Sequence, residues 1–283
     1  MPVVMKGVKM DYKLGLVAKD IQNSVTPTVY GAFATDLGLE ISFNIMNIPE
    51  NELSDTLEYA RQNLDGFNIT MPYKQAALAY MDELDETAVQ CGSTNTVLVQ
   101  SGKLIAYNTD GWGLIRALKQ RGVEVAHADI VMLGAGGVGY SIAYNLLENH
   151  VRSVKVVNIF LDQAEALCQK FGPVFTPHHL TYENLAICCK DADLFINASV
   201  MGQIGYDEFT SFEFLKELRP GATVFDVNYS NPDSKLVPTA RSMGIPAYNG
   251  KSMTACQGIR AMEIWTGKAP SDESAIALVE SFG

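Results

Sequence analysis

Short apolar runs alternate with amphipathic segments throughout the second half of the chain. Continuous apolar runs are typical of strands that are buried on both faces of a parallel sheet. Strands are predicted at 130–133, 154–158, 194–198, 223–228 and 245–248, with helices between them at 138–149, 162–171, 182–189, 211–217 and 235–243. Repeated strand–helix units predict an α/β fold with a doubly wound parallel sheet.

The first half has a more mixed pattern. Strands are predicted at 13–19, 41–48, 94–100 and 104–107 and from residue 66, and helices after Thr26 and at 50–63, 83–88 and 112–121. Val29, Phe33 and Leu37 recur every four residues, so the helix after Thr26 buries one face. A final helix at 252–266 is rich in Met and Ala and is expected to fold back onto the first domain.

The segment between the strand at 130–133 and its helix has the spacing G-x-G-x-x-G in Gly134, Gly136 and Gly139. In dinucleotide-binding folds these glycines permit a tight turn, close approach of a pyrophosphate, and close packing of helix on strand. The helix would also direct its N–H groups and positive dipole end at the phosphates. A glycine-rich turn in some other α/β protein is the alternative, but the flanking strand and helix favour nucleotide binding.

Composition narrows the class of protein. The 283 residues, 47% of them hydrophobic, suffice for one large or two ordinary domains. A net charge of −11 argues against nucleic acid and against an anionic membrane surface as partners. No apolar run approaches the ~20 residues of a membrane span, and the N-terminus lacks a signal-peptide pattern. The five cysteines show no metal-ligand spacing, which predicts reduced thiols in a cytoplasmic protein without a metal site.

The positions of the histidines restrict the candidates for acid/base chemistry. All four lie between residues 127 and 179. A proton carrier in the first domain is therefore expected to be Lys, Asp, Glu or Tyr. Asn68, Thr70 and Lys74 cluster at a predicted strand end, where ligands bind in open α/β sheets. An ordinary solvated lysine is the alternative interpretation of Lys74.

Three further polar residues stand at predicted helix starts. The hydroxyls of Ser24 and Thr26 could bind a substrate carboxylate, but spacing alone favours plain turn and cap chemistry. Asp110 lies at or near the N-cap of the helix at 112–121, where capping by itself contributes about 1 kcal/mol. For all three residues, a structural role in a turn or cap and a functional role both stay open from the sequence pattern alone.

A series of short motifs, in order along nearly the whole chain, resembles the shikimate dehydrogenase family. They are S-V-T-P at 24–27, F-N-I-T-M-P-Y-K at 67–74, S-T-N-T at 93–96, Y-N-T-D-G at 107–111, G-A-G-G-V at 134–138, D-L-F-I-N-A-S at 193–199, D-V-N-Y at 226–229, and G-K-S-M at 250–253 with Gln257 and E-I-W-T-G at 263–267. Each match is weak alone, but the matching order identifies the chain as a member.

The resemblance implies an N-terminal α/β substrate-binding domain (1–110 plus 251–283), a Rossmann-type NAD(P)-binding domain (111–250), and a site in the cleft between them. It implies reversible hydride transfer between a nicotinamide cofactor and shikimate or 3-dehydroshikimate. Lys74 and Asp110 match the family's acid/base pair, with Lys74 as the main acid/base and Asp110 as its partner; which of them carries the proton is left open. The substrate-binding residues would be Ser24, Thr26, Asn68, Thr70, Asn95, Tyr229 and Gln257. The cofactor-binding residues would be Gly134, Ala135, Gly136, Gly137, Val138, Asn158, Phe160, Asp162, Ala198, Val200 and Gly250.

Three departures from the family pattern refine this prediction. Thr26 stands where many relatives have serine, and members that accept quinate resemble this form, so quinate is a candidate substrate. Residues 159–163 lack the arginines with which NADP-using members bind the 2′-phosphate, which favours NAD over NADP. Asp162 would be either the acidic ribose ligand or the N-cap of the next helix. Gln203 stands where the family has a methionine that packs near the nicotinamide, so the chain departs from the family pattern at the position that seats the ring.

Two alternatives keep the fold but change the function. One is a paralogue that acts on a related cyclohexene or cyclohexane carboxylate, of the aminoshikimate type. The other is a degenerate, cofactor-binding regulatory module, against which the presence of both Lys74 and Asp110 argues. The sequence leaves open whether the protein is a monomer or a homodimer.

Overall fold

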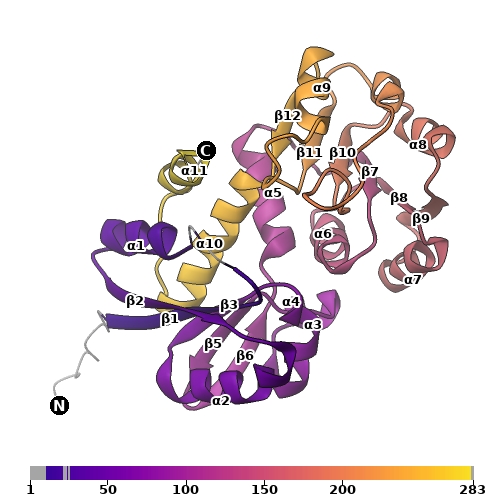
Figure 1. Ribbon diagram of the computed structural model, residues 1–283. Helices are drawn as coiled ribbons and strands as arrows, with labels where there is room; N and C mark the ends of the chain where they lie inside the picture. The colour runs from indigo at the N-terminus through magenta and orange to yellow at the C-terminus, as the bar shows by residue number, and fades with distance from the viewer. Residues whose placement is uncertain (1–10, 22–23, 25, 282–283) are drawn as a thin grey trace, which may run out of the picture. The chain divides into compact units, whose positions relative to one another are not determined.

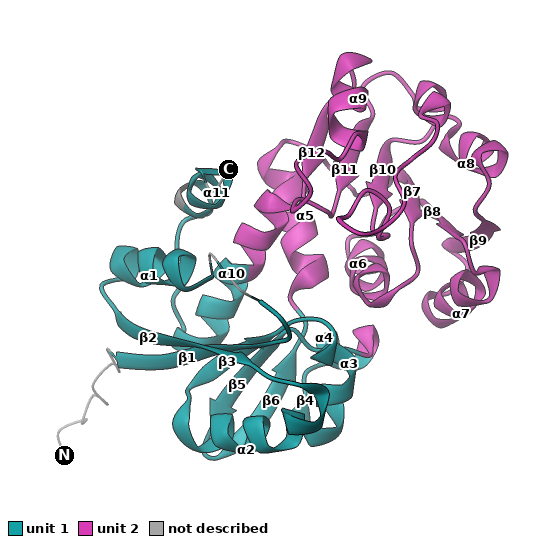
Figure 2. Ribbon diagram, in the orientation of Figure 1, with its two compact units in different colours: residues 1–89, 93–108, 258–283 teal, residues 90–92, 109–257 magenta. Residues whose placement is uncertain are grey.

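The computed structural model describes residues 11–21, 24 and 26–281 (Figure 1). They form two compact units (Figure 2). Unit 1 comprises the described residues of 1–89, 93–108 and 258–283, and unit 2 comprises 90–92 and 109–257. Each unit has its own six-stranded sheet.

Unit 1 contains a mixed sheet in the order β2-β1-β3-β5-β6-β4. Strand β1 is parallel to both β2 and β3, β5 is antiparallel to β3 and β6, and β4 is parallel to β6. The strands are β1 (Asp11–Ala18), β2 (Glu40–Asn47), β3 (Gly66–Ile69), β4 (Glu83–Leu84), β5 (Thr96–Gln100) and β6 (Lys103–Tyr107). The helices are α1 (Thr26–Leu37), η1 (Glu50–Glu52), α2 (Leu53–Asn63), α3 (Tyr73–Ala76), η2 (Ala77–Tyr80) and α11 (Asp272–Ser281), together with the first part of α4 (Glu86–Cys91) and the second part of α10 (Lys251–Thr266).

The C-terminal half of helix α10 packs within unit 1. The indole Nε1 of Trp265 donates a 2.9 Å hydrogen bond to the carbonyl of Val97 on β5. The ring of Tyr30 on α1 lies 5.2 Å from the ring of Trp265 and stacks on Phe43 at 5.3 Å. Aromatic pairs at such separations stabilise a fold beyond the area that they bury. These contacts join a segment far along the chain to the first helix and the central strands.

Unit 2 contains an entirely parallel sheet in the order β12-β11-β10-β7-β8-β9. Its elements are α5 (Asp110–Gln120), β7 (Asp129–Leu133), α6 (Gly137–Glu148), β8 (Ser153–Asn158), α7 (Leu161–Phe171), β9 (Phe175–His179), α8 (Tyr182–Cys189), β10 (Leu194–Asn197), η3 (Glu213–Glu217), β11 (Thr223–Asp226), α9 (Leu236–Ser242) and β12 (Ala247–Asn249). The strand order reverses between β7 and β10, so the carboxyl ends of these strands are the expected ligand site.

The structure confirms the predicted α/β class and the parallel sheet, and it corrects three elements. Strand β9 was not predicted, because Pro177 and two histidines interrupt the apolar pattern that is typical of a strand. Proline is tolerated there because β9 is an edge strand. The predicted helix at 83–88 is wrong, because Glu83–Leu84 pairs with β6 and the helix begins at Glu86. The segment predicted as a helix at 211–217 contains only a 3₁₀ turn, Glu213–Glu217.

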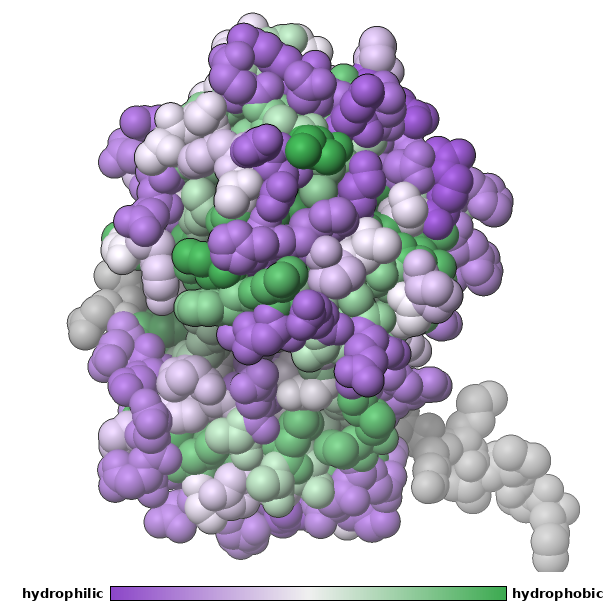
Figure 3. All heavy atoms as spheres, turned by 90° about the vertical axis from the view of Figure 1, so that its right-hand side faces the viewer, coloured by the Kyte–Doolittle hydropathy of each residue, from purple (hydrophilic) through white to green (hydrophobic). Residues whose placement is uncertain are grey.

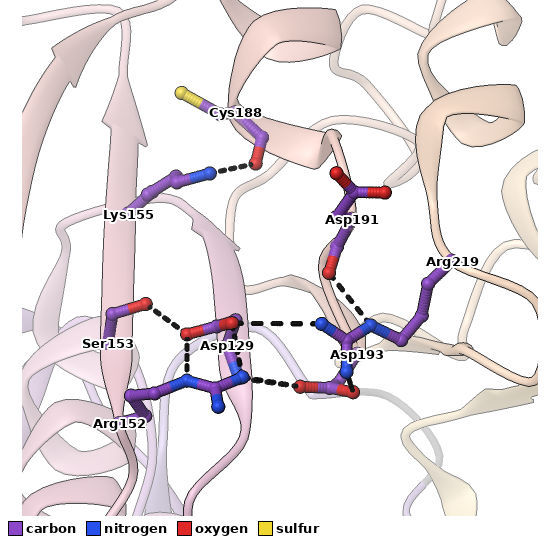
Figure 4. A network of polar contacts seen from close by, with 8 residues as sticks. All are labelled: Asp129, Arg152, Ser153, Lys155, Cys188, Asp191, Asp193 and Arg219. Atoms are coloured by element: carbon purple, nitrogen blue, oxygen red, sulfur yellow. Dashed lines mark hydrogen bonds and ion pairs between the residues drawn. The ribbon is translucent and has the colours of Figure 1, made fainter.

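A network of charges ties together the amino ends of strands β7, β8 and β10 (Figure 4). The Asp129 carboxylate accepts hydrogen bonds from Arg152 Nε (2.8 Å) and Ser153 Oγ (2.7 Å). The N–H of Asp129 donates to Asp193 Oδ2 (2.7 Å), and Arg219 pairs with Asp193 at 2.6 Å. The Arg152 hydrogen bond is the main cause of a lowered pKa for Asp129. This network supports the end of the sheet opposite to the strand ends where a ligand is expected.

The surface carries hydrophobic residues in scattered patches among hydrophilic ones on the face drawn in Figure 3. Among the most exposed apolar side chains of unit 2 are Ile159 and Phe160, which follow β8, and Ile204 in the segment after β10. No helix within the described residues has the length and hydropathy that a membrane span requires.

Candidate functional site

The glycine-rich turn between β7 and α6 has the geometry of a dinucleotide loop. Gly134 has φ = +110°, and a Cβ there would lie 2.7 Å from the carbonyl oxygen of Ala198. A Cβ at Gly139 would lie 2.7 Å from the carbonyl oxygen of Gly134, so this glycine lets the helix pack closely on the strand end. The first and third glycines of the motif therefore have the predicted structural roles.

The turn leaves room for an anion at the start of helix α6. A Cβ at either Gly136 or Gly137 would meet no atom within 4 Å. The first-turn N–H groups of a helix have no acceptor inside the helix, and the dipole there favours negative charge. The N–H of Ala135 is instead held by Asn158 Oδ1 at 3.2 Å. Open space beside a helix N-terminus fits a pyrophosphate. Val138 lies in the first turn of this helix.

Asn158, at the end of β8, contacts the start of helix α7. Its Nδ2 donates to the carbonyl of Phe160 (2.9 Å) and to Gln163 Oε1 (3.1 Å). Phe160 is the N-cap of helix α7 and is 58% exposed. Asp162 lies in the exposed first turn, so the interpretation of Asp162 as the N-cap is wrong. Residues 158–163 contain no Lys or Arg, as the sequence shows.

The other predicted cofactor residues follow strands β10 and β12. The N–H of Ala198 donates to the carbonyl of Leu133 at 2.7 Å, which places the chain after β10 beside the glycine-rich turn. Val200 is exposed and lies in the turn that follows. A Cβ at Gly250 would lie 3.1 Å from the ring of Tyr229, so these two predicted residues are neighbours.

Asp110 is the first residue of α5 and only 2% exposed. The next residue, Gly111, fixes it against helix α6: its N–H donates to Ser141 Oγ at 2.7 Å. A Cβ at Gly111 would lie 2.0 Å from the Ser141 carbonyl oxygen. Gln257 packs against helix α5: its Cγ lies 2.7 Å from the place that a Cβ of Gly113 would occupy. The close crossing of helices holds Asp110 in one place.

In unit 1, the predicted residue Asn68 is the centre of a polar cluster at the carboxyl end of β3. Its Nδ2 donates to the carbonyl of Asn95 (3.0 Å) and to Thr96 Oγ1 (3.2 Å), and its Oδ1 accepts from the Tyr30 hydroxyl at 2.7 Å. Burial raises the pKa of Tyr30, so its hydroxyl stays protonated and remains a donor. These three hydrogen bonds fix the orientation of the Asn68 amide.

Ser24 and Thr26 lie side by side at the start of α1. Ser24 Oγ donates to Thr26 Oγ1 at 2.8 Å and accepts from the Thr26 N–H at 3.2 Å. Helix α1 begins at Thr26 itself, one residue earlier than predicted. Thr70 follows β3, and its N–H donates to the Val17 carbonyl at 3.1 Å. Lys74 is half-buried in the short helix α3, and its carbonyl accepts from the Thr94 N–H at 2.8 Å.

Comparisons with known proteins match both units. The model "Shikimate dehydrogenase substrate binding domain" matches residues 16–97, and "Shikimate / quinate 5-dehydrogenase" matches residues 116–227. A protein of Alkaliphilus metalliredigens named shikimate dehydrogenase (NADP(+)) is 33% identical over 262 residues, which cover 90% of this chain and 91% of the relative. The chain belongs to the shikimate dehydrogenase family.

Solved structures show the same family fold. Shikimate 5-dehydrogenase from Listeria monocytogenes, in complex with shikimate and NAD, has a TM-score of 0.86 and 28% identity, with 99% of each chain covered. A ligand-free 5-ketofructose reductase from a Gluconobacter strain has a TM-score of 0.83 and 25% identity, with 96% of this chain and 99% of that chain covered. The resemblance predicted from the motifs is confirmed.

The roles of individual site residues stay predictions, but the structure shows which of them lie together within a unit. Asn68 contacts Asn95, Ser24 contacts Thr26, and Asn158 joins the glycine-rich turn. Lys74 belongs to unit 1 and Asp110 to unit 2. The sequence reasoning did not select Tyr30, Asn197, Asp226 or Asn228, although Asn197 and Asp226 end buried strands as Asn158 does. A polar residue at the end of an apolar run was the available signal.

Proposed function

We propose that this protein is an NAD(P)-dependent shikimate dehydrogenase that interconverts shikimate and 3-dehydroshikimate. One observation carries the proposal: a glycine-rich dinucleotide turn lies at the switch point of a parallel sheet, and the chain belongs to the shikimate dehydrogenase family. The residues present fit a nicotinamide dinucleotide, since the turn leaves open space at Gly136 and Gly137 beside a helix N-terminus.

Oxidation of an alcohol to a ketone removes a hydride from carbon and a proton from oxygen. The nicotinamide ring, when bound, accepts that hydride or returns it. The proton needs a group of this chain, and Lys74 is our candidate: its neutral amine accepts the hydroxyl proton, and its ammonium returns it in reduction. Asp110, the residue that the family resemblance pairs with Lys74, is the proposed partner in this proton transfer.

The remaining predicted residues bind and orient the substrate. Ser24 and Thr26 provide hydroxyls beside the N-terminal end of α1, where a carboxylate is favoured. Asn68 is held by Tyr30 and the Asn95 carbonyl, so its amide is preorganised at the strand end. Thr70, Asn95, Tyr229 and Gln257 complete the set that would contact ring hydroxyls and carboxylate.

Within this function, NAD is the cofactor that the residues after β8 favour. A 2′-phosphate needs a cationic partner, and residues 159–163 provide none. The exposed Ile159 and Phe160 cannot neutralise it, and the exposed Asp162 would repel it. The Alkaliphilus relative is named for NADP(+), whereas the Listeria structure holds NAD, so the family includes proteins recorded with either cofactor.

A grid of initial rates tests the proposal. The purified protein is incubated with shikimate or quinate and with NAD or NADP, and formation of the reduced cofactor is followed by its absorbance. We expect turnover of shikimate with NAD. Turnover of quinate would assign a role to Thr26, and Thr26→Ser should then lower the quinate-to-shikimate ratio. Turnover with NADP alone would overturn the NAD assignment, and no turnover with any pair would overturn the substrate assignment.

The likeness to a 5-ketofructose reductase supports a second candidate function. That enzyme's name shows that this fold also serves a ketone without a carboxylate. Reduction of a polyhydroxy ketone by this chain would therefore be consistent with the fold. The two functions differ at Ser24: its substitution by Ala should weaken the binding of shikimate strongly, but the binding of an uncharged ketone little.

A further inference from the structure

The carboxyl ends of β10 and β11 are joined by two buried polar side chains. Asn197 and Asp226 face each other in the register of the sheet and are 0% and 1% exposed. Asn197 Nδ2 donates to Asp226 Oδ1 at 2.9 Å, and the N–H of Asn228 donates to the same oxygen at 3.1 Å. One carboxylate oxygen thus fixes the end of β10 and the residues just after β11. The function proposed above gives Asp226 no role.

This pair anchors the segment 199–203. Asn197 Nδ2 also donates to the carbonyl of Met201 at 3.0 Å. Asn228 Nδ2 donates to the carbonyls of Ser199 and Met201, both at 3.0 Å, and Asn228 Oδ1 accepts from Gln203 Nε2. Side-chain amides therefore satisfy the backbone of a turn that has no strand or helix of its own.

The anchored segment lies directly against the dinucleotide turn. A Cβ at Gly134 would be 2.7 Å from the Ala198 carbonyl carbon and 2.8 Å from the Ser199 nitrogen. On the other side, a Cβ at Gly250 would be 1.9 Å from the carbonyl oxygen of Val227, the residue after Asp226. The chain segments after β10, β11 and β12 therefore converge around Asp226, on the side of the switch point away from Asn158.

We propose that Asp226 is a positioning residue for cofactor binding: through Asn197 and Asn228 it sets segment 198–203, which lies against the dinucleotide turn, and segment 227–229 beside it. It acts without touching the cofactor, because it is buried beneath these segments. The inference rests on the proposed function only in taking the bound molecule to be a nicotinamide dinucleotide. Removal of the carboxylate releases Asn197 and the Asn228 N–H together, so both segments lose their common anchor.

The test compares three variants by the Kd for NAD, measured by titration calorimetry without substrate. Asp226→Ala removes both acceptor contacts, and we expect its Kd to rise at least about tenfold, the effect of 1.4 kcal/mol. Asp226→Asn keeps one carbonyl oxygen for both donors and should restore the Kd to within about threefold. Asp233→Asn makes the same chemical change at an exposed position nearby and should leave the Kd unchanged.

Two further readouts separate positioning from a purely structural role. Thermal unfolding of each variant shows whether the protein is folded at the temperature of the titration. With shikimate, the Asp226→Ala change should appear in the KM for the cofactor, with kcat at saturating cofactor kept within about threefold. If Asp226→Ala does not fold, Asn228→Ala, which removes the contacts to Ser199 and Met201, should raise the Kd in its place.

An unchanged Kd in a folded Asp226→Ala protein would overturn the proposal, and so would a failure of Asp226→Asn to restore binding. These outcomes are independent of the substrate. A protein that binds NAD tightly but oxidises no shikimate would contradict the proposed function and leave the binding comparison intact.

Discussion

The side-chain oxygen of Asn158 accepts a hydrogen bond from the backbone N–H of Ala135 at 3.2 Å. This contact joins the tip of β8, where a ribose is expected, to the glycine-rich turn, where a pyrophosphate is expected. The amide nitrogen of Asn158 also holds the carbonyl of Phe160 at 2.9 Å. The residues that we propose to distinguish NAD from NADP are therefore fixed to the glycine-rich turn.

Phe160→Arg should raise the use of NADP relative to NAD. An arginine at this exposed position provides the cationic partner that a 2′-phosphate needs, and Phe160 provides none. We expect the ratio of kcat/KM for NADP to that for NAD to rise at least about tenfold, the effect of one charge-assisted contact. Lys170→Arg, on the same helix but in its last turn, is the control. An unchanged ratio in Phe160→Arg would mean that this segment does not face the ribose.

Gly111→Ala should destabilise the protein, because its methyl group would overlap the Ser141 carbonyl oxygen where α5 crosses α6. Overpacking of this kind costs about 1–3 kcal/mol. Gly31→Ala is the matched control: this helical glycine meets no atom within 4 Å, and alanine there should stabilise the helix by up to about 1 kcal/mol. Urea unfolding of both variants measures the difference. Equal stability of the two would contradict the close helix crossing.

Asp226→Asn should remove a pH dependence of stability. Burial raises the pKa of Asp226 to about 7, and the nearby charge of Glu208 acts in the same direction, whereas the Asn228 N–H, the Asn197 amide and the Ser234 hydroxyl oppose it. In the unfolded chain the pKa of this carboxyl is about 4. Between these values the folded state holds a proton that the unfolded state has lost, so stability falls as pH rises.

The expected size of this effect is on the order of a few kcal/mol, since each unit of pKa corresponds to about 1.4 kcal/mol. Urea midpoints of the unsubstituted protein and Asp226→Asn, taken at about pH 5 and about pH 8, provide the measurement. The variant should gain stability over the unsubstituted protein at the higher pH. A difference that is the same at both pH values would show that Asp226 keeps an ordinary pKa.

The parts of the fold and site that the sequence predicts depend on short-range patterns. Gly134 and Gly139 could be assigned because their spacing is fixed by one turn between one strand and one helix. The apolar runs predicted the parallel sheet of unit 2 because both faces of its strands are buried. Strand β9 was not predicted because it forms through its pairing with β8, and its own residues carry no strand pattern.

The rest depends on contacts between segments that are far apart in the chain. Tyr30 holds Asn68 across 38 positions, and Asn197 holds Asp226 across 29. Neither pair has a spacing that a local pattern could reveal, because the strand order brings β10 beside β11 and the packing of α1 brings Tyr30 to β3. The sequence predicted Asn68 from its place at a strand end and from the family resemblance, but it did not predict Tyr30.

Lys74→Ala provides the most direct test of the central claim, that this chain oxidises shikimate with Lys74 as its acid/base. The initial rate of cofactor reduction is measured at saturating shikimate and NAD, beside the exposed control Lys103→Ala. We expect kcat to fall at least about hundredfold in Lys74→Ala, with the Kd for NAD unchanged, and to stay near its original value in the control. Undiminished turnover in Lys74→Ala would contradict the account.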